Sequence, residues 1–139
     1  MENLAPKLIQ LFNRYPNVSD DEMALIYSDK AVFEDPIVRI EGLENIISYF
    51  RKMYLGVLHC QFECTSSFEI DGNAAIKWFM QLKHRALNNG KLISLHGCSI
   101  IQYSDRIQFH RDYFDVGEMV YENLPILRSI IKRIKSRIH

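Results

Sequence analysis

Residues 43–70 read LENIISYFRKMYLGVLHCQFECTSSFEI, and the hydrophobic pattern changes within this stretch. Up to Tyr54, apolar residues recur with the spacing of one face of an α-helix. From Val57 onward, apolar and polar residues alternate, which is typical of a strand with one buried face. Gly56 lies between the two patterns, and glycine often follows a helix C-terminus. The stretch therefore predicts a helix followed directly by a long strand.

Two shorter helices are predicted before this stretch. Helical spacing extends over residues 4–15 and ends at a proline. A capping-box pattern predicts a second helix over residues 19–27. Residues 32–33 favour a brief strand. Asp35 lies at its end, because the proline that follows disfavours helical backbone at this position.

Turn signals divide the sequence after residue 70 into further strands. Asp71-Gly72, Asn89-Gly90 and Ser104-Asp105 are interpreted as two-residue hairpin turns. The predicted strands cover residues 57–70, 74–87, 91–103 and 106–115. Helices followed by an antiparallel meander predict an α+β fold in which helices cover one face of a curved sheet. We expect one domain over residues 1–139, with residues 116–139 as a C-terminal helical extension.

Composition narrows the classes of function. The chain has 139 residues, of which 47% are hydrophobic, which suits one domain with one core. Its 17 basic and 17 acidic residues give a formal net charge of zero, so no nucleic-acid partner is expected. No apolar run approaches the roughly 20 residues of a spanning helix. We expect a soluble, cytoplasmic protein.

The cysteines predict neither disulfides nor a metal site. Cys60, Cys64 and Cys98 are an odd set, which argues against a disulfide framework. Cys60 and Cys64 also lie on one predicted strand, about 13 Å apart. Because no clustered Cys/His pattern occurs, no zinc, other metal or cofactor is expected.

The expected turns fix a register and gather polar groups on an apolar sheet face. Under this register Ser99 lies opposite His110 and Gly97 opposite Asp112. A dry core would leave such polar groups without partners, so the face indicates a cavity. A slip of one residue would move His110 and Asp112 to the other face. The residues predicted on this face are Trp78, Met80, Leu82, His84, Ser99, His110, Asp112 and Phe114.

Three segments carry a resemblance to a known family. Residues 27–36 read YSDKAVFEDP, Gly42 opens the next helix, and residues 110–115 read HRDYFD. With this order of elements, residues 4–115 resemble the nuclear transport factor 2-like superfamily, and within it the ketosteroid isomerases and SnoaL-like polyketide cyclases. The resemblance implies a cone-shaped sheet around helices, with an internal pocket.

The resemblance also implies roles for individual residues. Asp35 falls on the general-base Asp of ketosteroid isomerases. The oxyanion-binding Tyr of those enzymes falls near Leu11 or Phe12, and their protonated Asp falls on Ser99, so steroid isomerisation is not expected. SnoaL-like cyclases use an Asp on a late strand as acid/base, and Asp112 has a comparable place.

We therefore predict a small hydrophobic ligand, carbonyl-bearing or lipid-like, and isomerase- or cyclase-like proton transfer. Asp35 is the expected base, and His110 with Asp112 the acid/base pair or oxyanion donor. Alternatively, Asp35 is a turn or cap residue, and the pair lies on an exposed polar face. The alternative functions are a non-catalytic ligand carrier and a protein-binding module. The predicted ligand-binding residues are Tyr27, Tyr49, Trp78, Met80, Leu82, His84, Ser99 and Phe114.

Two further surfaces have predicted partners. The outer sheet face carries apolar side chains among charged ones, which favours a homodimer. Residues 126–139 form a basic amphipathic pattern with five cations and no acid. We expect this segment to pack mainly on its own dimer, with weak contact to anionic membranes as the alternative. The outer apolar residues are Phe79, Ile100, Phe109 and Tyr113.

Overall fold

The computed structural model describes residues 3–118, 133–134 and 136–137. Its elements are α1 (Leu4–Asn13), α2 (Asp20–Ile26), β1 (Tyr27–Glu34), β2 (Arg39–Glu41), α3 (Leu43–Tyr54), β3 (Val57–Ile70), β4 (Asn73–His84), a 3-10 turn (Asn88–Gly90), β5 (Ile93–Tyr103) and β6 (Ile107–Phe114). The α+β prediction is confirmed. Most of the predicted C-terminal helix lies outside the described residues, and within them no helix is long and apolar enough to cross a membrane.

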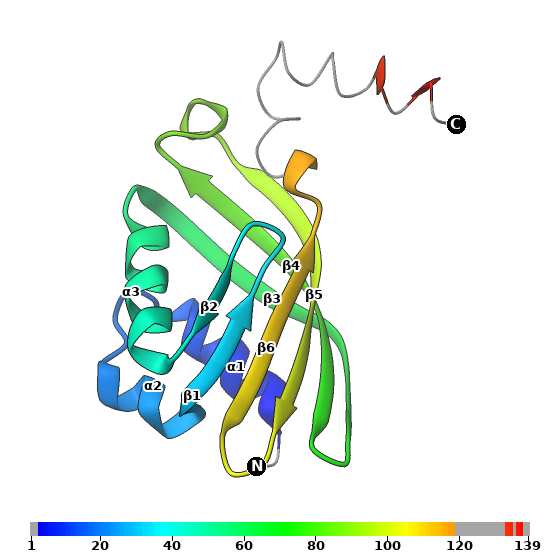
Figure 1. Ribbon diagram of the computed structural model, residues 1–139. Coiled ribbons are helices and arrows are strands. Elements are labelled where there is room, and N and C mark those ends of the chain that lie inside the picture. The colour runs from blue at the N-terminus through cyan, green and yellow to red at the C-terminus, as the bar shows by residue number, and fades with distance from the viewer. Residues whose placement is uncertain (1–2, 119–132, 135, 138–139) are drawn as a thin grey trace.

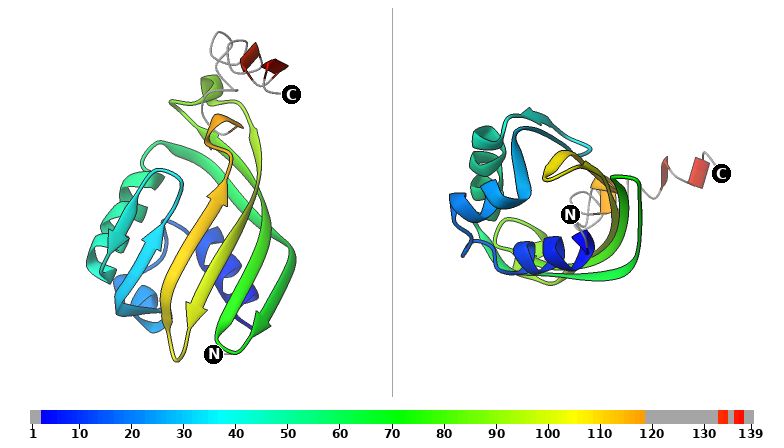
Figure 2. Two further views of the ribbon diagram at one scale, coloured as in Figure 1. Left: turned by 45° about the vertical axis from the view of Figure 1, so that its right-hand side comes forward. Right: turned by 90° about the horizontal axis from the view of Figure 1, so that it is seen from below.

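One six-stranded sheet forms the body of the fold, in the order β2-β1-β6-β5-β4-β3. β1 and β6 are parallel, and the other neighbours are antiparallel. The sheet curves around α1, with α2 and α3 on the side of β1 (Figures 1 and 2). This is the cone that the resemblance implied.

α1 is fixed inside the curve by its apolar face and by its last residue. Leu4, Leu8 and Leu11 are almost fully buried. The Asn13 side chain donates to the Phe62 carbonyl at 3.0 Å and accepts from the Phe62 N–H at 2.7 Å. The C-terminal end of the helix is therefore hydrogen-bonded to the backbone of β3.

The first strand is longer than predicted. α2 ends at Ile26, and Tyr27 has extended backbone (φ −105°, ψ 140°), so it begins β1 instead of ending the helix. The Ser19 capping box that opens α2 is confirmed, since both of its reciprocal hydrogen bonds are present. β-branched and aromatic residues of 27–34 favour a strand once β6 is beside them.

Two of the three predicted turns are wrong in length. Asp71-Gly72 is confirmed, because Ile70 lies opposite Asn73 and both turn residues have positive φ. The β4–β5 connection is a loop over residues 85–92 that contains the 3-10 turn, so the register differs by four residues from the prediction. The β5–β6 connection spans residues 104–106, which moves that register by two residues.

Both registers differ from the prediction by an even number of residues, so the same side chains still lie on the predicted face of the sheet. Ser99 lies opposite Asp112, not His110, yet His110 and Asp112 still point to the same side as Trp78. A strand with a period of two keeps its inner and outer residues under any even shift.

β3 departs from strict alternation at two irregularities. Its register shifts between Val57 and His59 and again near residue 65. Beyond the second shift the faces exchange, so Phe68 and Ile70, which were expected inside, are 74% and 72% exposed. Leu58, also expected inside, is 57% exposed for the same reason at the first shift.

Candidate functional site: a double cavity with two carboxylates

Asp35 is held in the loop that joins β1 to β2. Its Oδ1 accepts from the Ile37 and Val38 N–H groups at 2.8 and 2.9 Å, and its Oδ2 accepts from the Tyr49 hydroxyl at 2.6 Å. The Asp35 N–H donates back to the Val38 carbonyl at 3.0 Å. Asp35 is only 5% exposed. Its carboxylate thus shapes the loop and also faces the cavity.

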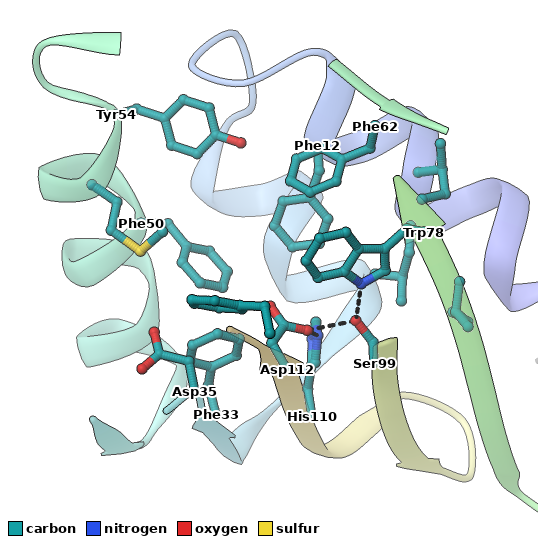
Figure 3. A pocket seen from close by; sticks show the side chains of 15 residues that line it. Phe12, Phe33, Asp35, Phe50, Tyr54, Phe62, Trp78, Ser99, His110 and Asp112 are labelled. Atoms are coloured by element: carbon teal, nitrogen blue, oxygen red, sulfur yellow. Dashed lines mark hydrogen bonds and ion pairs between the residues drawn. The ribbon is translucent and has the colours of Figure 1, made fainter. Parts of the chain in front are cut away.

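The second carboxylate, Asp112, belongs to a chain of hydrogen bonds across three strands. The Trp78 indole N–H donates to the Ser99 hydroxyl at 3.0 Å, and that hydroxyl donates to Asp112 Oδ1 at 2.5 Å. His110 Nε2 lies 2.7 Å from the same oxygen. Figure 3 shows Asp112 between Ser99 and the side where Asp35 lies.

Tyr27 completes this chain behind His110. Its hydroxyl lies 2.7 Å from His110 Nδ1, and the two rings are stacked. Complete burial raises the pKa of the Tyr27 phenol well above its ordinary value. A protonated phenol donates to Nδ1, so a neutral His110 carries its proton on Nε2 and donates it toward Asp112. His110 is 2% exposed and is therefore locked from both sides.

The carboxylates face two adjoining chambers. The inner chamber has a volume of about 80 Å³ and is lined by Ser99, His110 and a group of aromatic rings. The outer chamber, of about 270 Å³, opens between the β1–β2 loop, the end of α3 and the β4–β5 loop. Asp35 and Asp112 line both chambers. Together the chambers lie within the lower end of the roughly 300 to 1,000 Å³ range of small-molecule sites.

The cavity lining carries acidic side chains but no lysine or arginine among the described residues. The acidic side chains are Asp35 and Asp112. Burial and the bond to Asp35 raise the pKa of Tyr49, which therefore stays a neutral donor. In the part of the chain that the structure describes, no three acidic, histidine or cysteine side chains are grouped as metal ligands. An anionic ligand would meet two carboxylates and no fixed cation.

Most of the predicted site residues line the cavity. Tyr27 does not, and His84 lines it but also bonds backbone groups. Met80 and Leu82 line the outer chamber, and Trp78 and Phe114 line both. Tyr27 lines neither chamber; it lies behind His110. His84 lies in the outer chamber, where its ring bonds the Leu55 carbonyl at 3.2 Å and the Ala86 N–H at 3.0 Å.

Several lining residues were predicted only as core or not singled out. Phe50 and Tyr54 are one helical turn apart on α3, and Tyr54 points into the cavity (Figure 3). Burial raises the pKa of Tyr54 and raises that of Cys60 beside it to about 11. The helical spacing placed these side chains inside, but no sequence signal separates a cavity wall from a packed core. The other aromatic lining residues are Phe12, Phe33 and Phe62.

The sequence profile of the SnoaL-like domain matches residues 8–109, well over half of the chain. The chain belongs to the SnoaL-like domain family. No curated protein matches the sequence of this SnoaL-like domain.

Solved structures share the fold of this SnoaL-like domain at low sequence identity. A hypothetical protein from Catenulispora acidiphila with a ketosteroid isomerase-like fold, in complex with trimethylamine, has a TM-score of 0.73 at 8% identity, over 85% of this chain and 89% of its own. A proposed SnoaL-like polyketide cyclase from Shewanella denitrificans has a TM-score of 0.70 at 18% identity, over 85% and 92%. A proposed hydroxylase from Streptomyces galilaeus has a TM-score of 0.67 at 13% identity, over 84% and 79%.

Proposed function

We propose that the protein binds a small, neutral and largely apolar carbonyl compound in the double cavity and moves a proton at the carbon beside the carbonyl group. This proposal rests on how the two oxygens of the Asp112 carboxylate are hydrogen-bonded. Its Oδ1 accepts two hydrogen bonds, whereas no hydrogen bond among the described residues uses Oδ2. The side chain is 23% exposed in a cavity that is otherwise apolar. A carboxylate with one fixed and one open oxygen suits general acid/base chemistry.

In this reaction Asp112 Oδ2 takes the proton, and the electron pair of the broken C–H bond moves onto the carbonyl oxygen. His110 and Ser99 hold Asp112 in place through Oδ1. Tyr54 points into the same space, and its protonated hydroxyl can turn from the Cys60 thiol to donate to the developing oxyanion. Where the carbonyl compound carries a double bond between its β and γ carbons, returning the proton to the γ carbon moves that double bond beside the carbonyl group and completes an isomerisation.

Asp35, the base expected from the resemblance, is the second proton carrier in this proposal. A carboxylate offers about four acceptor positions, and three donors occupy Asp35. One position on Oδ2 is left for a proton. Because its other bonds shape the loop, Asp35 also positions the entrance of the cavity.

The test is deuterium incorporation beside the carbonyl of bicyclic aryl ketones and 1,3-diketones in heavy water, followed by NMR. We expect Asp112→Asn to lower the exchange rate by about 10²- to 10⁴-fold, since the Asn amide oxygen can keep the Oδ1 bonds but the amide cannot accept a proton from carbon. Asp35→Asn should lower it as well, and Asp105→Asn, at an exposed turn, is the matched control. Exchange by Asp112→Asn at the wild-type rate would rule out the proposed role.

Ketosteroid isomerisation in the same assay should be weak or absent. Ser99 stands where ketosteroid isomerases have a protonated Asp, and it already donates to Asp112. Leu11 is buried core and Phe12 is a lining ring, so neither replaces the oxyanion-binding Tyr. Full steroid turnover would contradict this assignment.

A second candidate is a non-catalytic carrier of small organic amines. Two carboxylates and several aromatic rings, with no lysine or arginine in the described lining, would favour a cation. The structurally similar Catenulispora protein holds trimethylamine. Titration calorimetry with choline and its neutral carbon analogue 3,3-dimethylbutan-1-ol separates the candidates: the carrier prefers choline, and the carbonyl enzyme does not.

A further inference from the structure

We propose that the open end of the cavity docks on an anionic lipid bilayer. Five large aliphatic side chains on the segments that border this opening are exposed to solvent. They come from the β1–β2 loop, the end of α3, the start of β3 and the β4–β5 loop, which lie at the upper end of the cone in Figure 1 and in the left view of Figure 2. They are Ile37 (62% exposed), Met53 (45%), Leu55 (73%), Leu58 (57%) and Leu92 (44%).

These side chains form one surface. The Arg85 N–H donates to the Gly56 carbonyl at 2.9 Å, and the His84 ring bonds the Leu55 carbonyl, so the end of α3 and the β4–β5 loop are directly joined. A Cβ at Gly90 would lie 3.8 Å from Leu58. Ile37 and Met53 line the outer chamber and are also exposed, so the apolar surface continues into the cavity.

The charges on the same segments select a negatively charged partner. Residues 36–38, 51–59 and 85–92 contain no acidic residue. Lys52, Arg85 and Lys91 are exposed and form no ion pair within the described residues, whereas Arg51 is paired with Asp20. The acidic residues that line the outer chamber are Asp35, which is buried in the β1–β2 loop, and Asp112. Exposed aliphatic tips among unpaired cations are the pattern by which a protein lies on an anionic membrane surface.

A bilayer suits this surface better than a second copy of the chain. A second copy would bring the same cations opposite each other, while anionic headgroups neutralise them. The sequence beyond Glu118 contains one acidic residue, Glu122, and five Lys or Arg residues, which are Arg128, Lys132, Arg133, Lys135 and Arg137. Docking would place the outer chamber against the acyl chains, so a lipophilic ligand could enter without crossing water. That last step rests on the proposed function; docking itself does not.

The test is sedimentation of the full chain with vesicles of phosphatidylcholine containing about one third phosphatidylserine, at low and high salt. We expect binding at low salt and little binding to neutral vesicles. Leu55→Ser with Leu58→Ser should lower the partition coefficient at least tenfold, and Leu25→Ser, at an equally exposed leucine on α2, should not. Lys52→Gln with Lys91→Gln should lower the partition coefficient about fivefold per cation removed. Lys7→Gln with Lys30→Gln is the matched control pair and should leave it unchanged.

Hydrogen exchange of the wild-type chain needs no variant and guards against misfolding of the substituted proteins. Added anionic vesicles should slow exchange at residues 53–58 and 85–92. The proposal is overturned if the wild type does not sediment, or if the Leu55/Leu58 variant sediments fully while a chain ending at residue 123 does not. It is also overturned if the Leu55/Leu58 substitutions change the oligomeric state instead. Because no outcome involves turnover, failure here is distinct from failure of the proton-transfer assay.

Discussion

At the level of single residues, the site depends on how Asp112 is held. Gly97 decides part of that geometry, because the Trp78 indole packs directly over it. A Cβ at position 97 would come within 2.1 Å of the ring. The indole can therefore reach the Ser99 hydroxyl, which in turn bonds Asp112. The sequence predicted these side chains on one face, but the contact between a glycine and a ring on the next strand depends on the register, which was predicted four residues out.

Gly97→Ala should displace Trp78 and loosen this chain of hydrogen bonds. Overpacking a filled site costs about 1 to 3 kcal/mol, so the free energy of unfolding in urea should fall by that amount. Trp78 is the only tryptophan in the chain, so its fluorescence reports the displacement directly. Cys98→Ala, at the neighbouring position on the opposite sheet face, is the control. An unchanged spectrum and stability would contradict the packing argument.

The thiol of Cys60 gives a prediction of pH dependence. Burial raises its pKa to about 11, and the hydrogen bond with Tyr54 opposes only part of this shift. Thiolate is the reactive form, so at pH 8 only about one molecule in a thousand is reactive. Alkylation by iodoacetamide, followed by peptide mass spectrometry, should rise about tenfold per pH unit up to pH 11. In urea the same cysteine should react at an ordinary rate; rapid reaction of the folded protein at pH 8 would contradict the burial of this thiol.

At the level of elements, the sequence predicted the faces of the strands better than their partners. Alternation alone assigns inner and outer residues, and it survives the even shifts of both hairpins. It fails in β3, where an added residue near position 65 exchanges the faces and exposes Phe68 and Ile70. An irregularity of this kind is set by the curvature of the whole sheet, which one strand does not encode. The loop over residues 85–92 escaped prediction because Asn89-Gly90, a typical pair for a two-residue turn, lies here in a longer loop whose 3-10 turn also holds Asn88 at positive φ.

α2 is short, and its stability depends on its start. The Ser19 hydroxyl accepts from the Glu22 N–H at 3.1 Å, and Glu22 accepts from the Ser19 N–H at 2.9 Å. Ser19→Ala removes a side-chain acceptor from the first turn and should lower the free energy of unfolding by about 1 kcal/mol. Ser48→Ala, at an exposed position within α3, should change it far less. Equal effects of the two substitutions in urea titrations would show that the cap does not stabilise α2.

At the level of the whole molecule, the two faces of the sheet have separate tasks. The inner face lines the cavity, and the outer face carries a row of neighbouring positions across four strands: Phe68, Ala75, Ile100 and Arg111. Phe68 and Ile100 are exposed in this row, and Ile70 and Tyr113 extend it. An apolar surface of this kind, crossed by few charges, suits a symmetric contact between two copies. The homodimer predicted from the sequence remains a proposal. This row of residues is the surface through which we expect the two copies to contact each other.

Phe68→Glu with Ile100→Glu should therefore yield monomers in sedimentation velocity experiments in which the wild type is a dimer. Like charges would face each other across the two-fold axis, and each copy would lose its most exposed ring. Leu25→Glu on α2 adds charge at a similarly exposed apolar residue outside the row and should leave the dimer intact. Because the substituted side chains point away from the cavity, the monomeric variant should still exchange α-protons and still sediment with anionic vesicles. A wild type that stays monomeric at high concentration would contradict the dimer, whereas loss of exchange in a folded monomer would mean that the partner copy supports the cavity.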